Sequence, residues 1–174
     1  MGAPRWVGSI GVAAAVGVSY YLAAYVSLSG LFFYQSEGVT VFWAAAGVSS
    51  GLMIGFGSRA RWPVIAGVFV GAFLIPLVVL ERGIWLSTIF AICDVAEPVI
   101  ISGLIARYFG EGFTLDRLRK VFGFLGATIA GTAPSSLGGA VASRLFLGPK
   151  TEILTTWLHW WTGVAVGVVT VARS

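Results

Sequence analysis

Two carboxylic acids stand inside a long apolar run, in the segment FAICDVAEPVII at residues 90–101. Asp94 and Glu97 are three residues apart, so they share one face of the helix that this run predicts. An ionisable side chain near the middle of a bilayer costs about 2.5–3.5 kcal/mol on insertion scales, and it faces the protein interior or a wet cavity. The pair therefore predicts an interior polar site for recognition of a ligand or partner. The structural alternative is that both acids only fix helix packing.

Further polar atoms are expected at the same depth. Pro98 follows Glu97 at once, and its ring displaces the carbonyl of Asp94 from a helical hydrogen bond. The stretch GTAPSSLGGA at residues 131–140 places a proline among small and hydroxyl residues, so we expect it to kink or unwind inside the protein. This stretch is expected to bring Ser135 and Ser136 to the polar layer. The first two predicted helices are expected to add Ser19, Ser49 and Ser50.

The composition is that of a membrane protein. Of the 174 residues, 57% are hydrophobic and 10% charged, against about 25% charged in a typical soluble domain. Several apolar stretches approach the roughly 20 residues that cross a bilayer as a helix. We predict an all-α integral membrane protein, a bundle of about six transmembrane helices at residues 6–28, 39–56, 62–80, 84–108, 118–146 and 153–172.

The basic residues predict the orientation of these helices. Alternating spans place eight Lys and Arg on one side and three on the other, and the richer side faces the cytoplasm. Both termini are therefore expected in the cytoplasm, and membrane lipids are expected partners. A net charge of +4 gives no reason to expect nucleic acid. The basic residues assigned to the cytoplasmic side are Arg5, Arg59, Arg61, Arg107, Arg117, Arg119, Lys120 and Arg173.

Catalytic and metal-binding patterns are missing from the sequence. It has no GxSxG, no HExxH and no phosphate-binding glycine loop, so we expect no enzyme and no cofactor. His159 is the only histidine and Cys93 the only cysteine, which leaves no metal-ligand spacing. Two interpretations of His159 stay open: a proton switch, or a packed interfacial histidine beside Trp160.

Glycines recur every four residues on single faces of three predicted helices. Such faces allow helices to approach closely, either within one bundle or in contact with a second copy. The glycines concerned are Gly47, Gly51 and Gly55 in the second helix, Gly67 and Gly71 in the third, and Gly163 and Gly167 in the sixth.

Four segments in order resemble a known family: FWAAAGVSSGLMIGFG at 42–57, SRARWPVIAGVFVGAFL at 58–74, DVAEPVIISGLIARYFG at 94–110 and WLHWWTGVAVGVV at 157–169. They are similar to the bacterial membrane-associated sensor domain of the first class, the MASE type. Two positions depart from that family's pattern, because Asp94 stands where Asn is usual and Val164 where Asp is usual. The residues that match are Trp43, Gly47, Arg59, Arg61, Trp62, Pro63, Glu97, Trp160, Trp161 and Gly163.

The resemblance implies one sensor-like transmembrane domain, which we expect to cover residues 1–174, in the bacterial inner membrane. The family usually leads into a cytoplasmic output domain, and we expect none in this chain. Such a domain would bind a small ligand or membrane partner and signal to a cytoplasmic output. Two alternatives stay open: a non-catalytic accessory subunit of a larger membrane complex or homo-oligomer, and a small substrate-binding subunit of a transporter. The candidate ligand or partner contacts are Trp43, Ser49, Ser50, Asp94, Glu97, Ser135, Ser136, His159, Trp160 and Trp161.

Overall fold

The computed structural model describes residues 5–29, 33–34, 39–40, 42–110, 112–148 and 152–171. Most of these residues form helices, as the sequence predicts, and the rest form one pairing of two-residue strands and the connections between elements. Four of the six predicted ranges agree with an α helix of the structure to within one residue at each end, and the third, 62–80, does so only when the π-helical turn that follows α3 is included. The α helices are α1 (Arg5–Leu28), α2 (Ala44–Phe56), α3 (Arg61–Leu74), α4 (Ile84–Phe109), α5 (Leu118–Leu147) and α6 (Ile153–Val171).

The second helix is the exception, because it begins at Ala44 and not at residue 39. The residues before it form an antiparallel pairing between β1 (Phe33–Tyr34) and β2 (Val39–Thr40). Helix α1 then fixes where α2 begins, since the Ser27 hydroxyl accepts a hydrogen bond from the Ala44 N–H at 3.0 Å. A serine of the preceding helix thus provides the cap that Trp43, at the N-cap position itself, cannot provide.

The third span is α-helical only over its first part. A 3-10 turn, η1 (Gly57–Ala60), joins α2 to α3, and Gly57 there has a φ of 59°. Helix α3 then continues into a π-helical turn, η2 (Ile75–Val79), which contains Pro76. A proline interrupts the α-helical hydrogen bonds, and single π turns are a common way to accommodate such an interruption.

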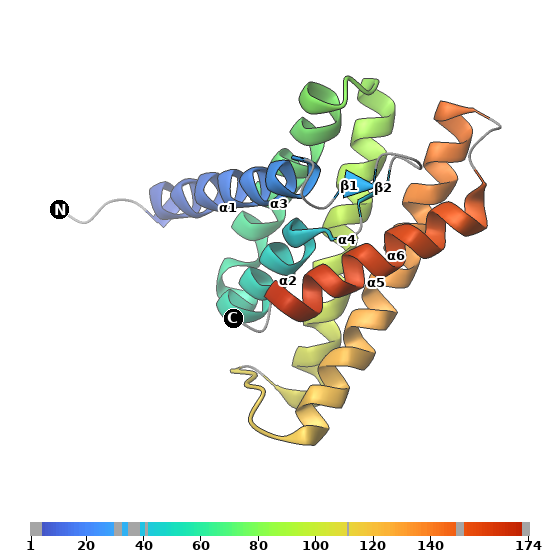
Figure 1. Cartoon of the computed structure of the whole chain (residues 1–174). Helices are drawn as coiled ribbons and strands as arrows, with labels where there is room; N and C mark the ends of the chain where they lie inside the picture. The colour runs from blue at the N-terminus through green and yellow to red at the C-terminus, as the bar shows by residue number, and fades with distance from the viewer. Residues whose placement is uncertain are drawn as a thin grey trace.

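The helices cross one another at steep angles. Figure 1 shows α1 (blue) running across α3 and α6 (red) running across α4 and α5, whereas α3, α4 and α5 run closer to the vertical of the view. Helix α1 packs on α3 and α2, and α6 packs on α5 and α2, so α2 lies between the two crossing helices. In Figure 1, α1 begins at the left, and the α2–α3 junction and the end of α6 lie left of the centre. The α4–α5 connection lies at the bottom.

Glycine contacts set the closest helix approaches. A Cβ at Gly47 would overlap the backbone of Gly167, and one at Gly167 would overlap the carbonyl of Trp43. Gly67 and Gly71 are packed in the same way against the backbone and side chains of α1. The predicted role of these four glycines in close packing is confirmed. Gly55 is different, because a Cβ there would meet open space, so this glycine does not bring two helices of the bundle together. Its alternative predicted role, contact with a second copy, stays a prediction.

Length and hydropathy single out three of the described helical segments as able to cross a membrane: Gly8–Leu28, Arg61–Val79 and Ile84–Phe109. Helix α2 is apolar but has only 13 residues. Large apolar side chains are also exposed along several helices, among them Val18, Val70 and Ile92. An apolar surface of this kind is unusual for a soluble monomer.

Candidate functional site

The centre of the predicted polar layer is a hydrogen bond between two helices. The Tyr20 hydroxyl of α1 donates to Asp94 Oδ2 of α4 over 2.7 Å, and Tyr20 is 1% exposed. A buried tyrosine hydroxyl is expected to find such a partner, and a bond to a carboxyl group is stronger than one between neutral groups when the carboxyl is ionised. Asp94 therefore faces the protein interior, as predicted, and connects α4 to the helix that crosses it.

Glu97 lies one helical turn further along α4 and is almost completely enclosed. It is 2% exposed, and its Oε1 has no hydrogen-bond partner among the described residues. Helix α5 comes close here because residue 131 is glycine: a Cβ at Gly131 would lie 3.2 Å from the Glu97 carbonyl oxygen and would overlap Ile101. A buried carboxyl oxygen without a partner is costly, so it needs a functional or structural explanation.

The opposite face of this layer comes from α5. The Ser135 hydroxyl donates to the carbonyl of Cys93 over 2.9 Å and so ties α5 to α4 beside the two acids. The sequence predicts that residues 131–140 kink or unwind. They do not unwind, because α5 is helical from Leu118 to Leu147 with Pro134 inside it. Hydroxyls line that stretch, and Thr132 and Ser136 bond to backbone carbonyls of their own helix.

Two tryptophans of α6 donate hydrogen bonds to α5 next to Pro134. Trp157 Nε1 donates to the Ala133 carbonyl over 2.9 Å, and Trp161 Nε1 donates to Thr132 Oγ1 over 3.0 Å. The two indole rings stack with centroids 5.6 Å apart and an interplanar angle of 6°. These rings therefore hold α6 against α5, so they are contacts between helices inside the protein.

A small cavity of about 10 Å³ lies beside Asp94, between α4, α5 and α6. Its walls include Ser135 and Ser136 together with the rings of Phe90 and Trp160, which form an edge-to-face pair with centroids 5.1 Å apart. This volume is close to the minimum that admits one water molecule. A ligand larger than water can therefore reach Asp94 from this side only if the surrounding helices separate.

Comparison with known proteins adds the family. The model of the MASE1 family matches residues 12–173, nearly the whole chain and all of the site described above. The chain belongs to the MASE1 family. MASE1 domains are membrane-associated sensor domains, and the resemblance inferred from the four sequence segments is thereby confirmed. No curated protein and no solved structure matches the chain.

The remaining predicted residues of this MASE1 domain do not all lie together. Ser49 is buried and donates to the Ala46 carbonyl of its own helix over 3.0 Å. Ser50 is fully buried, and its hydroxyl has no partner among the described residues. Trp43 is half-buried at the start of α2, where its backbone N–H donates to the Gly163 carbonyl of α6 over 3.1 Å.

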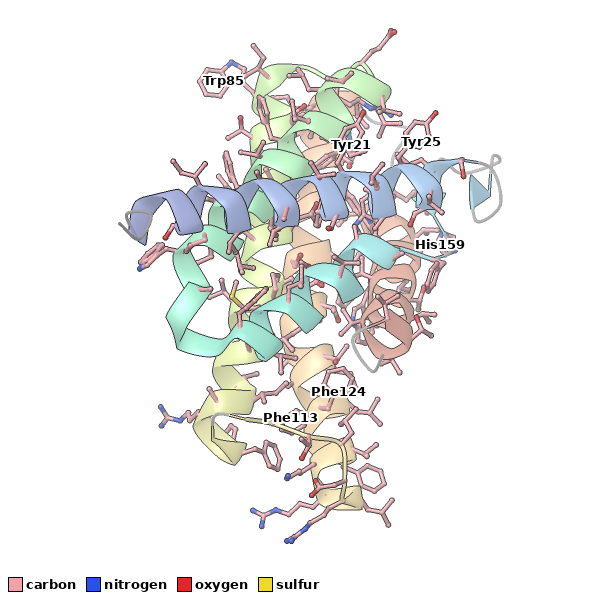
Figure 2. All side chains as sticks on the ribbon, turned by 90° about the vertical axis from the view of Figure 1, so that its left-hand side faces the viewer. Tyr21, Tyr25, Trp85, Phe113, Phe124 and His159 are labelled. Carbon is pink, nitrogen blue, oxygen red and sulfur yellow. The ribbon has the colours of Figure 1, made fainter. Side chains whose placement is uncertain are left out.

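His159 lies apart from the polar layer. Its side chain is exposed, and Figure 2 shows it at the edge of the molecule on α6. The two neighbouring positions face inward instead, because Trp160 packs on Phe90 and Trp161 bonds to Thr132. Of the three adjacent residues predicted as contacts, the structure thus brings the two tryptophans to the α4–α5–α6 contact and leaves the histidine outside.

Sequence reasoning missed Tyr20, the residue that completes the site from α1. It expected Ser19 to supply the polar atom, but Ser19 is exposed and Tyr20 points inward. Thr132, the acceptor for Trp161, was also missed. A signal for Tyr20 existed, because a tyrosine within an apolar helix needs a hydrogen-bond partner if it is buried.

Proposed function

We propose that this MASE1 domain is a multi-pass sensory module of the bacterial inner membrane, in which the polar layer around Glu97 recognises a small ligand or a membrane partner. All six helices would lie within the membrane, with both termini in the cytoplasm. The module binds and transmits, and it carries out no catalysis. Family membership supports a sensory role, and the long apolar helices support a place in the membrane.

The observation that carries the proposal is the incomplete hydrogen bonding of Glu97 beside the Tyr20–Asp94 bond. A ligand or partner that donates to Glu97 Oε1 would gain a hydrogen bond that the described residues do not provide. Its binding would favour the helix arrangement in which Glu97 Oε1 is accessible to the ligand. A ligand shifts such an equilibrium only by its difference in affinity for the two states.

Tight packing around the site supports coupling of binding to helix movement. The space beside Asp94 is about 10 Å³, so a ligand larger than water must displace α6 or α5 to enter from that side. Tyr20 would carry such a displacement to α1, because its hydroxyl bonds directly to Asp94. In this mechanism the residues that recognise the ligand also form the helix contacts that change when it binds.

One observation favours the accessory-subunit alternative. An apolar groove of about 520 Å³ runs between α1 and α3, with Ala14, Val18, Val70 and Leu74 among its lining residues. A helix of another membrane protein fits such a groove, and so do lipid chains. A stable complex recovered after gentle solubilisation, with no effect of Glu97 on any output, would favour this alternative.

The test uses a chimaera in which the whole chain precedes a diguanylate cyclase domain as a cytoplasmic output. We expect Glu97→Gln and Tyr20→Phe to change cyclase output in membranes by about 5-fold or more, which is the low end of ordinary allosteric coupling. The matched controls are Glu152→Gln and Tyr25→Phe, because both side chains are exposed. Equal output from wild type and both site variants, at equal membrane levels, contradicts the proposal.

A further inference from the structure

A second cavity lies at the other end of α4, away from the acids. Its volume is about 270 Å³, it is open on one side, and it is lined by the end of α2, the start of α3, the end of α4 and the start of the α4–α5 connection. Glycines make the room: Gly55, Gly57, Gly103, Gly110 and Gly112 line it, and a Cβ at any of them would meet nothing within 4 Å. This volume is near the lower end of small-molecule sites.

The cavity wall carries one positive charge and no acid among its described residues. Arg61, the first residue of α3, supplies the guanidinium and forms no ion pair with the described part of the chain. Ser102 adds a hydroxyl, whose own bond to the Val99 carbonyl is long at 3.4 Å. A guanidinium that has no ion-pair partner among the described residues is suited to bind a phosphate group in a bidentate manner.

The rest of the wall is apolar, so the cavity has two kinds of surface. Met53, Ile54, Phe56 and Ile105 line it. Phe113 completes it from the α4–α5 connection and is held between Phe109 and Phe124, with ring centroids 5.5 and 6.4 Å away. Figure 2 shows Phe113 and Phe124 side by side at the end of the molecule opposite Trp85. A charged donor over apolar walls matches a molecule that is itself part anionic and part apolar.

Neighbouring residues support a position for this cavity at the level of lipid headgroups. Trp62 follows Arg61 and is 78% exposed, and Tyr108 near the end of α4 is also exposed. Exposed Trp and Tyr at helix ends are typical of the membrane–water interface. On the orientation proposed above, this end of α4 faces the cytoplasmic leaflet, which holds the anionic lipids that attract basic residues.

We propose that the cavity around Arg61 binds the phosphate-bearing headgroup of an anionic phospholipid. Arg61 and Ser102 hold the phosphate, while Phe56 and Phe113 contact the glycerol and upper acyl carbons. The lipid would then bridge the start of α3 and the end of α4. This inference rests on the membrane placement proposed above, which resistance of the chain to alkaline extraction from membranes tests separately. It does not depend on Glu97.

The test measures lipid binding to the purified full-length chain in detergent micelles. Phosphatidylglycerol, phosphatidylcholine and soluble glycerol 3-phosphate are titrated, and thermal unfolding and native mass spectrometry report binding. We expect wild type to prefer phosphatidylglycerol to phosphatidylcholine, and Arg61→Gln to weaken phosphatidylglycerol binding by about 10-fold or more, the loss typical of a charge-assisted hydrogen bond. Gly103→Leu fills the cavity without touching the charge and is expected to have the same effect.

Two matched variants separate this site from general attraction between basic residues and anionic lipid. Arg107→Gln removes an exposed charge at the same end of α4, outside the cavity lining, and Gly126→Leu adds a leucine to open space on α5. Both are expected to bind phosphatidylglycerol as wild type does. The proposal is overturned if Arg107→Gln and Arg61→Gln weaken binding equally, if neither cavity variant weakens it, or if glycerol 3-phosphate binds as well as the lipid.

Discussion

Tyr20 and Asp94 are 74 positions apart in the chain, yet the tyrosine hydroxyl lies 2.7 Å from the aspartate oxygen to which it donates a hydrogen bond. Helix α1 otherwise packs mainly on α3 and α2, so this bond is a specific polar connection from α1 to α4. It also gives the site a directional contact that apolar packing does not provide. Removing the hydroxyl while keeping the ring tests this contact with little change in packing.

We expect Tyr20→Phe to destabilise the fold by about 1–3 kcal/mol, because it leaves a buried carboxyl oxygen without its donor. Reversible unfolding in mixed micelles measures the change. Tyr25→Phe on the same helix serves as the control, since Tyr25 is 51% exposed and a surface change is expected to stay within about 0.5 kcal/mol. Equal stability of the two variants would show that the Tyr20–Asp94 bond contributes nothing measurable.

The contact between α2 and α6 depends on glycine at position 167. A Cβ there would overlap the carbonyl group of Trp43, and backbone atoms cannot move aside as a flexible side chain can. We expect Gly167→Ala to destabilise the protein by about 3 kcal/mol or more. Gly126→Ala is the matched change, because its Cβ meets open space and an alanine there is expected to stabilise the helix by about 0.5–1 kcal/mol. The same unfolding measurement distinguishes the two, and a tolerated Gly167→Ala would contradict this packing.

The indole N–H of Trp161 is expected to contribute to the α5–α6 contact. Trp161→Phe keeps an aromatic ring but loses the donor to Thr132 Oγ1, so we expect a loss of about 0.5–1.5 kcal/mol. Trp85→Phe is the comparison, since Trp85 is 76% exposed and Figure 2 shows it pointing away from the bundle. The interpretation is wrong if the two substitutions change the unfolding midpoint alike.

An ion pair between the α4–α5 connection and the first turn of α5 predicts an effect of pH on stability. Lys120 Nζ lies 2.8 Å from Asp116 Oδ1, and the hydrogen bond from Lys120 lowers the pKa of the Asp116 carboxyl. Because the folded pKa lies below the unfolded one, the pair stabilises the fold above the unfolded pKa. That contribution is lost as the pH falls through the folded value. NMR titration of the carboxyl carbon measures the pKa, and we expect Lys120→Gln to raise it. A pKa that is the same in both proteins removes Lys120 as the cause.

The helices were predictable because each apolar run is long and bounded by charged or turn-forming residues. The start of α2 was not, since Val39–Thr40 continues the apolar pattern although it pairs with Phe33–Tyr34. Hydropathy does not distinguish a short strand from the first turn of a helix when both are apolar. Likewise, residue spacing in the sequence does not indicate that Ser27 caps α2, because that contact depends on how α1 and α2 pack together.

The site was predictable from α4 and only partly from its neighbours. Acids within an apolar helix must face inward, and Glu97 and Asp94 do so. Which α1 residue meets them depends on the rotation of α1 about its axis. That rotation is set by contacts of Gly67 and Gly71 with α1, which place Tyr20 inward and Ser19 outward. Such contacts involve two helices at once, so the periodicity of one helix cannot reveal them.

The stacked pair of Trp157 and Trp161 gives the protein its own spectroscopic marker. Two indoles 5.6 Å apart couple their electronic transitions, and we expect this coupling to contribute to the ultraviolet circular dichroism of the protein. Both rings are hydrogen-bonded to α5, so the signal depends on how α6 is seated there. We therefore expect a movement of α6 to change the absorption of polarised light by the unlabelled protein.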